Sequence, residues 1–191
     1  MIGSLPMSLN VGGKEYAIRA DYREILNIFE AFNDSKLTDE EKAYVCLKCL
    51  YVDFDSIMQS DYLQEAVDKA YWFCDGGDCP KSEPEQVKTL DWRHDESIIF
   101  PAVNKSAGFE VRSCEFLHWW SFLGIFGEID EGLFSTVMNI RTKKVHHKPL
   151  EKWEKEFYVK NKRLINITTS EDEEGEKADE AFLNELLGIE Q

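Results

Sequence analysis

The sequence predicts a mainly α-helical protein, with a compact helical domain, a small β-hairpin at its N-terminus and an acidic tail at its C-terminus. Apolar residues recur at helical spacing along most of the chain, whereas strand-like alternation is confined to residues 7–19. At 191 residues and 43% hydrophobic content, the chain is long enough to bury a core. We therefore expect one helical globular domain over residues 1–167. Residues 168–191 are expected to form a largely disordered acidic tail with a short amphipathic helix.

The first predicted element is the hairpin. Residues Met7–Val11 and Lys14–Arg19 alternate in the manner of strands around Gly12-Gly13. Two glycines can adopt the positive φ values of a tight turn, so this pattern predicts two antiparallel strands.

Three helices are predicted next, two of them from capping signatures. Asp21 with Glu24, and Thr38 with Glu41, have the spacing of a capping box. A third helix is predicted to open at Ser60 or Asp61 and to stop at Gly76-Gly77 and Pro80. The apolar residues of the three predicted helices share a face in each case, as a core-facing helix requires. They are Tyr22, Ile25, Leu26 and Phe29; Tyr44, Val45, Leu47 and Leu50; and Leu63, Ala66, Val67, Ala70 and Phe73.

The second half of the chain predicts four more helices. One runs from Asp91 to about Asn104, and Pro101 inside it must cost a backbone hydrogen bond or force a kink. Ser113 is predicted to cap a helix over residues 116–126 that is apolar almost all round, as a central buried element would be. A short helix follows Gly132. A longer one begins at Pro149 and carries on one side Leu150, Trp153, Phe157 and Tyr158.

Charge and cysteine content exclude several classes of protein. A formal net charge of −15 would repel a phosphate backbone, so we expect no nucleic acid partner. The first residues show no basic region followed by an apolar stretch, and no later window approaches the length of a membrane span. We therefore expect a soluble protein with no membrane partner. Five cysteines without regular spacing indicate reduced thiols.

The charge is distributed unevenly. Residues Arg141–Arg163 hold nine Lys/Arg against three Asp/Glu, whereas residues Glu171–Gln191 hold nine acidic residues against one basic residue. The acidic run predicts disorder, and the apolar residues after it form a candidate recognition element. In the alternative reading, the acidic tail aids solubility or folds back onto the basic helix.

Metal binding is weakly indicated. Cys46 and Cys49, with Cys74 and Cys79, could supply four thiolates to zinc. The first pair, however, falls inside a helical pattern, where free cysteine behaves as a small apolar residue. The aspartates at 53, 55 and 61 lack the glycine and glutamate of a calcium loop. We expect no metal and no cofactor.

Catalytic patterns are equally weak. His94 with Asp91 and Asp95 could form a carboxylate–histidine pair, or a charge cluster at a helix start. His118 is expected to be a hydrogen-bonded core histidine, and His146-His147 an exposed basic turn. No serine has the context of a nucleophile elbow, and the glycines make no phosphate-binding loop. We expect no enzymatic activity.

Several segments, taken in order, carry a family resemblance that runs over residues 8–167. They are Leu37–Ala43, Asp91–Asp95, Leu117–Gly124, Ile140-Arg141 and Leu150–Phe157. Their order resembles the bacteriophage gene-product-fifteen family of Gram-positive phages and prophages, encoded between the major tail protein and the tape-measure protein. The resemblance implies a tail assembly chaperone in the host bacterial cytoplasm. Its implied partner is the tape-measure protein, with the major tail protein as a second candidate, and it supplies no catalytic residues.

A chaperone of this kind requires exposed apolar side chains with a charged rim. Such side chains are expected among the aromatics and in the tail. The candidates are Trp92, Phe100, Phe109, Trp153, Phe157, Tyr158, Phe182 and Leu186. The alternative for each aromatic is that it fills the core. Two rival functions remain: a structural tail component retained in the virion, and a zinc-binding protein or enzyme.

Overall fold

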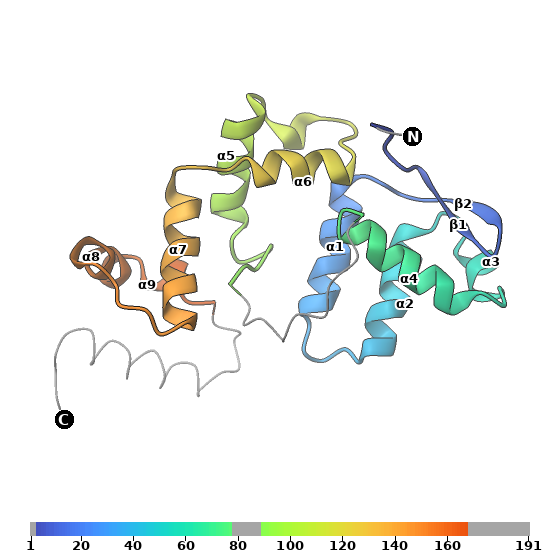
Figure 1. The fold of residues 1–191 in the computed structure, drawn as a ribbon, viewed down its shortest axis with the longest axis horizontal. Coiled ribbons are helices and arrows are strands. Elements are labelled where there is room, and N and C mark those ends of the chain that lie inside the picture. Colours follow the sequence, from blue (N-terminus) through green and yellow to red (C-terminus); the bar gives the residue numbers. More distant parts are fainter. Residues whose placement is uncertain (1–2, 78–88, 168–191) are drawn as a thin grey trace. The chain divides into compact units, whose positions relative to one another are not determined.

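The computed structural model describes residues 3–77 and 89–167. Within these residues the chain forms nine α-helices, one short 3-10 helix and one two-stranded antiparallel sheet (Figure 1). This confirms the predicted mainly helical class with an N-terminal hairpin. The predicted tail, with Phe182 and Leu186, lies outside the described residues.

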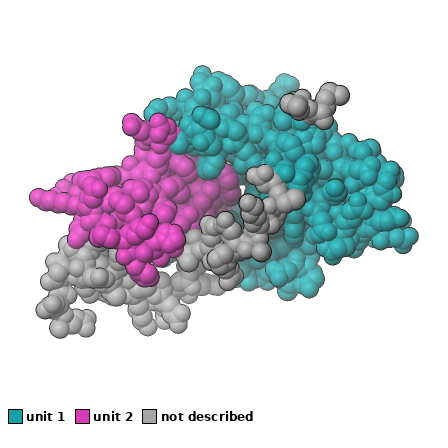
Figure 2. All heavy atoms as spheres, in the orientation of Figure 1, with its two compact units in different colours: residues 1–86, 100–129 teal, residues 87–99, 130–191 magenta. Residues whose placement is uncertain are grey.

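Two compact units can be distinguished (Figure 2). Unit 1 comprises residues 1–86 and 100–129, and unit 2 comprises residues 87–99 and 130–191. A compact unit can be smaller than a domain, so the single domain expected over residues 1–167 stays a prediction.

Unit 1 begins with the hairpin of β1 (Ser8–Val11) and β2 (Lys14–Ala17), in which Leu9 pairs with Tyr16. Gly12 and Gly13 both have positive φ, as the sequence predicts. A side chain at Gly12 would also collide with the Tyr62 ring, which packs against the turn. The hairpin is therefore fixed both by its turn and by its contact with the chain before α4 (Leu63–Cys74).

The helices of unit 1 start where their caps lie. Asp21 accepts a hydrogen bond from the Arg23 amide at the start of α1 (Tyr22–Asn33), and Thr38 with Glu41 completes a capping box for α2 (Asp39–Leu50). The third predicted helix is α4, which starts at Leu63 without a side-chain cap. The short α3 (Phe54–Met58), capped by Asp53, precedes it and was not predicted.

In the rest of unit 1, the cap of the helix after η1 (Val111–Ser113) lies at another residue than the predicted Ser113. Residues Val111–Ser113 form the 3-10 helix η1, and the next helix, α6, spans Trp119–Gly127. Ser113 therefore does not cap this helix. His118 does, because its Nδ1 accepts a hydrogen bond from the Trp120 amide at 3.0 Å. In the core, the Phe122 ring stacks on Tyr22, with ring centroids 4.6 Å apart.

Helix α5 (Glu96–Ala107) contributes its first residues to unit 2 and the remainder to unit 1. It begins five residues later than predicted from Asp91, because Asp91 forms a turn in which its Oδ1 accepts from the amides of Arg93 and His94. Pro101 lies inside the helix, and the helix continues past it.

Unit 2 is built from α7 (Leu133–Val145), α8 (Lys152–Lys160) and α9 (Lys162–Ile165). Helix α8 begins after a capping box of Glu151 and Glu154, so Pro149 precedes the helix instead of opening it. The core of the unit consists of Ile140, Leu150, Tyr158 and Ile165, with Phe157 packed against it. None of the helices found in residues 3–77 and 89–167 combines the length and the apolar character that spanning a bilayer demands.

Candidate partner-binding surface

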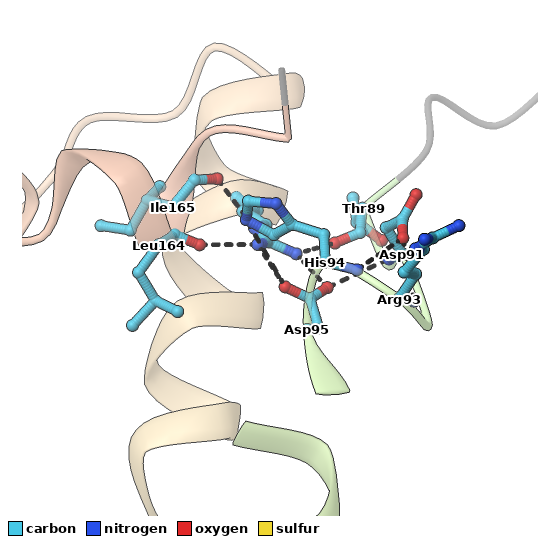
Figure 3. Close-up of polar contacts among 8 residues, drawn as sticks. Thr89, Asp91, Arg93, His94, Asp95, Leu164 and Ile165 are labelled. Carbon is cyan, nitrogen blue, oxygen red and sulfur yellow. Dashed lines mark hydrogen bonds and ion pairs between the residues drawn. The ribbon is translucent and has the colours of Figure 1, made fainter. Parts of the chain in front are cut away.

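A buried ion pair fixes the helices of unit 2 (Figure 3). Arg141 on α7 donates from Nη1 and Nη2 to the two carboxylate oxygens of Asp95, at 2.6 and 2.7 Å. The same guanidinium donates to the carbonyl oxygens of Leu164 and Ile165 on α9, and to that of Thr89. Because these acceptors belong to α9 and to the turn before α5, one side chain joins both of them to α7.

A second buried group joins α8 to α7. The Glu154 carboxylate is fully buried and accepts from Lys143 Nζ at 2.6 Å and from Asn139 Nδ2 at 3.0 Å. Its other oxygen accepts from the Glu151 amide in the capping box. Since Glu154 and Tyr158 lie one helical turn apart, they mark the inner face of α8.

The outer side of α8 carries apolar side chains. Trp153 is 50% exposed and Val159 is 49% exposed, while Phe157 is half-buried. Trp153 and Phe157 lie one helical turn apart and are therefore neighbours along the helix. The Trp153 indole nitrogen donates to Glu151 Oε2 at 2.8 Å, which holds the ring in a defined position.

Basic side chains lie along α8, α9 and the turn before them. Six residues make up this set, and among the described residues none of the six has an ion-pair partner: Lys148, Lys152, Lys155, Lys160, Lys162 and Arg163. We call them, together with Trp153 and Phe157, the cationic α8–α9 surface. Glu156 is exposed on the same helix and offsets part of the charge. An exposed aromatic side chain with cations on the same helix fits an acidic, amphipathic partner.

Two aromatic side chains that were expected on the surface are buried. Phe100 is only 8% exposed, because its ring packs against both Tyr22 and Phe122 and is covered by the Arg112 guanidinium. Tyr158 is fully buried on the inner face of α8, where its hydroxyl donates to Asn166 Oδ1. Neither ring can line an accessible surface.

The remaining predicted residues are dispersed. Phe109 in unit 1 is 46% exposed and follows the end of α5. Trp92 is half-buried in the turn before α5. Of the predicted residues, the structure thus brings Trp153 and Phe157 together on one helix of unit 2, whereas their binding of a partner stays a prediction.

One accessible apolar cluster was missed by sequence reasoning. Leu5 and Met7 are exposed on either side of Pro6, whose carbonyl oxygen lies 3.0 Å from His118 Nε2. The Phe116 ring is 51% exposed, with its centroid 6.5 Å from that of His118. The prediction placed Phe116 inside a buried helix. The sequence signal was the histidine directly before Trp119-Trp120. A helix that is capped by His118 begins at Trp119, so Phe116 lies outside the buried helix.

The candidate metal and catalytic groups have structural partners. Cys46 and Cys74 are buried in the core of unit 1, and the pKa of the Cys74 thiol is raised by its hydrogen bond with Cys46 and by burial. Cys79 lies outside the described residues. His94 Nε2 is 4.0 Å from Asp95 Oδ1, but Arg141 occupies both oxygens of that carboxylate. Among residues 3–77 and 89–167, no group of three or more His, Cys, Asp or Glu could hold a metal ion.

Comparison with known proteins identifies the family. The family model described as "Bacteriophage Gp15 protein" matches residues 1–167. The chain belongs to the bacteriophage Gp15 protein family. The match to the Gp15 family includes both units as far as α9 and ends where the acidic segment begins. No curated protein and no solved structure matches the chain.

Proposed function

We propose that this Gp15 family member is a non-catalytic tail assembly chaperone that binds the tape-measure protein through the cationic α8–α9 surface. The observation that carries the proposal is the exposure of Trp153 on a helix whose lysines at 152, 155 and 160 have no ion-pair partner among the described residues. Membership of a bacteriophage family supplies the context. The major tail protein is a second candidate partner.

The chemistry of this surface suits reversible binding of a helix. A chaperone must cover an apolar face of its client and then release it, so a few anchoring rings serve better than a large interface. Tryptophan is enriched among residues that dominate binding energy, because its large ring buries much area at little conformational cost. The lysines add long-range attraction for acidic clients and speed encounter without large affinity.

The buried contacts that hold α8 in unit 2 support the same role. Its inner face is held by Glu154 with Lys143, and the chain after it by Arg141. Binding at the outer face therefore requires little ordering of the chaperone itself, which reduces the entropic cost of association.

The test is co-expression with the tape-measure protein, followed by affinity pull-down and measurement of the soluble tape-measure yield. Trp153→Ala should reduce both the captured and the soluble amounts. A matched control is Tyr44→Ala, which removes an aromatic ring of similar exposure from α2 in unit 1. Equal capture by wild type and by Trp153→Ala would rule out this surface.

The alternative is a structural tail component retained in the virion. The two functions differ in where the protein is found after assembly. A chaperone should be present in infected or induced cells and missing from purified tails, whereas a structural component should be detected in the tails at a fixed stoichiometry to the tail tube.

A further inference from the structure

We propose that residues 168–191 bind in cis to the cationic α8–α9 surface and compete there with the chaperone's client. The binding in cis is supported by the charge of the segment, by its length and by the point where it follows α9. The competition with a client rests in addition on the proposed function.

Charge complementarity selects the surface. Residues 168–191 hold nine acidic residues and one basic residue. Unit 1 repels such a segment, because its described residues hold 17 acidic against nine basic side chains. The cationic α8–α9 surface offers instead six side chains without an ion-pair partner among the described residues. The segment and this surface therefore carry uncompensated charge of opposite sign.

Attachment brings the two together. The segment follows Ile167, two residues after α9 ends, and the chain at this point is held firmly. Arg141 binds the carbonyl oxygens of Leu164 and Ile165, and Lys144 Nζ donates to Asn166 Oδ1 at 3.0 Å. The acidic segment thus starts from a fixed position beside the cations.

The segment is long enough to span the cationic α8–α9 surface. A flexible chain of 24 residues has a root-mean-square span of roughly 25–30 Å. Helix α8, with nine residues, is only about 14 Å long. A tether of this length gives an effective concentration of about a millimolar. That concentration favours binding to the segment's own chain over a second copy at micromolar protein.

The sequence of the segment also matches the apolar part of the surface. Its apolar residues have the spacing of one helical face that can form on binding, and the exposed Trp153 ring, one helical turn from Phe157, offers an apolar counterpart. These residues of the segment are Phe182, Leu183, Leu186 and Leu187. A client helix with an acidic, amphipathic face presents the same chemistry, so segment and client compete.

The first arm of the test uses the full chain alone and is independent of any client. Amide chemical shifts of the isotope-labelled protein are compared with those of a variant carrying Glu171→Gln, Asp172→Asn, Glu173→Gln and Glu174→Gln. Shift changes are expected over residues 152–163, and 0.5 M salt should reproduce them in the wild type, because salt screens the attraction. A matched control with Asp53→Asn, Asp55→Asn, Asp61→Asn and Glu65→Gln changes four acidic residues of unit 1 and should leave residues 152–163 unchanged.

Two outcomes of this arm overturn the proposal. Unchanged shifts over residues 152–163 in the neutralised variant would show that the segment does not bind there. Shift changes that vanish on dilution of the wild type would show that the segment binds a second copy instead of its own chain.

The second arm measures the affinity of the same two full-length proteins for the tape-measure protein. If the segment occupies the surface about 90% of the time, neutralising it should tighten client binding by about tenfold. Shift changes in the first arm with unaltered client affinity would remove the competition and leave the cis binding standing. Absence of any client binding would instead contradict the proposed function and would leave the first arm unaffected.

Discussion

Arg141 and Asp95 form a bidentate ion pair that is almost completely buried, with side chains 4% and 0% exposed. The guanidinium also donates to three carbonyl oxygens, so the buried charge of Arg141 is surrounded by hydrogen-bond acceptors. Leaving one partner of such a pair uncompensated is costly, because the remaining charge stays buried.

Arg141→Met should therefore lower the free energy of unfolding by about 3–5 kcal/mol. Arg141→Lys should also destabilise the protein, since an ammonium group cannot reproduce the planar, bidentate geometry. The measurement is urea denaturation followed by circular dichroism. Arg163→Lys is the matched control, because Arg163 is exposed and lacks an ion-pair partner among the described residues. A loss below about 1 kcal/mol for Arg141→Met would contradict this account of unit 2.

His118 is the second polar group whose loss should be measurable. Its Nδ1 accepts from the Trp120 amide and its Nε2 lies 3.0 Å from the Pro6 carbonyl oxygen, so both ring nitrogens of this buried side chain have partners. His118→Ala should destabilise the protein by about 1–3 kcal/mol through loss of the cap and of a buried hydrogen bond.

His118→Asn provides the comparison for the cap. Its side-chain oxygen can accept from the Trp120 amide, so it should lose less stability than His118→Ala in the same denaturation experiment. Equal losses for the two variants would show that the cap contributes nothing measurable.

These two side chains also show what sequence can predict about the fold. Caps at Asp21 and Thr38 were predictable because donor and acceptor lie within three residues. His118 caps α6 in place of Ser113, and its second ring nitrogen contacts the Pro6 carbonyl oxygen, 112 residues away, a contact that the sequence next to His118 does not predict. The ion pair of Asp95 with Arg141 joins residues 46 positions apart, so local sequence does not predict it either.

The candidate surface was predictable only in part. Helical spacing correctly places Trp153 and Phe157 on one side of α8. Whether a given ring is exposed depends on what packs against it: Phe100 is covered by rings from α1 and α6, and Trp153 is covered by nothing comparable. Aromatic content alone therefore cannot separate binding residues from core residues.

The thiols should differ in reactivity. Cys46 and Cys74 are buried, and the hydrogen bond between them, with burial, raises the pKa of Cys74. Burial also raises the pKa of Cys49, which is half-buried. Because the thiolate is the reacting form and burial limits access, Cys49 should be alkylated later than Cys114 among the four described cysteines, and Cys46 and Cys74 only on unfolding. Iodoacetamide labelling with mass spectrometry at successive times measures this order. Early labelling of Cys74 in the native protein would contradict it.

Glu110 should remain ionised in unusually acid solution. Arg112 donates from Nε and Nη2 to its two carboxylate oxygens at 2.7 and 2.8 Å, and this lowers the pKa of Glu110 from 4.5 to about 2. Asn104 Nδ2 donates to the same carboxylate at 2.8 Å, while the Asn104 side-chain oxygen accepts from the Val111 amide. The carboxylate therefore links the end of α5 to η1.

A folded-state pKa below the unfolded value stabilises the folded state above pH 4.5, and this contribution is lost as the pH falls from about 4.5 towards 2. Titration of the Glu110 side-chain carbon by NMR should place its midpoint near 2 in the wild type and closer to 4.5 in Arg112→Gln. The variant should accordingly lose the part of the acid dependence of stability that Glu110 supplies. An unchanged midpoint in Arg112→Gln would show that a group other than the guanidinium holds the charge.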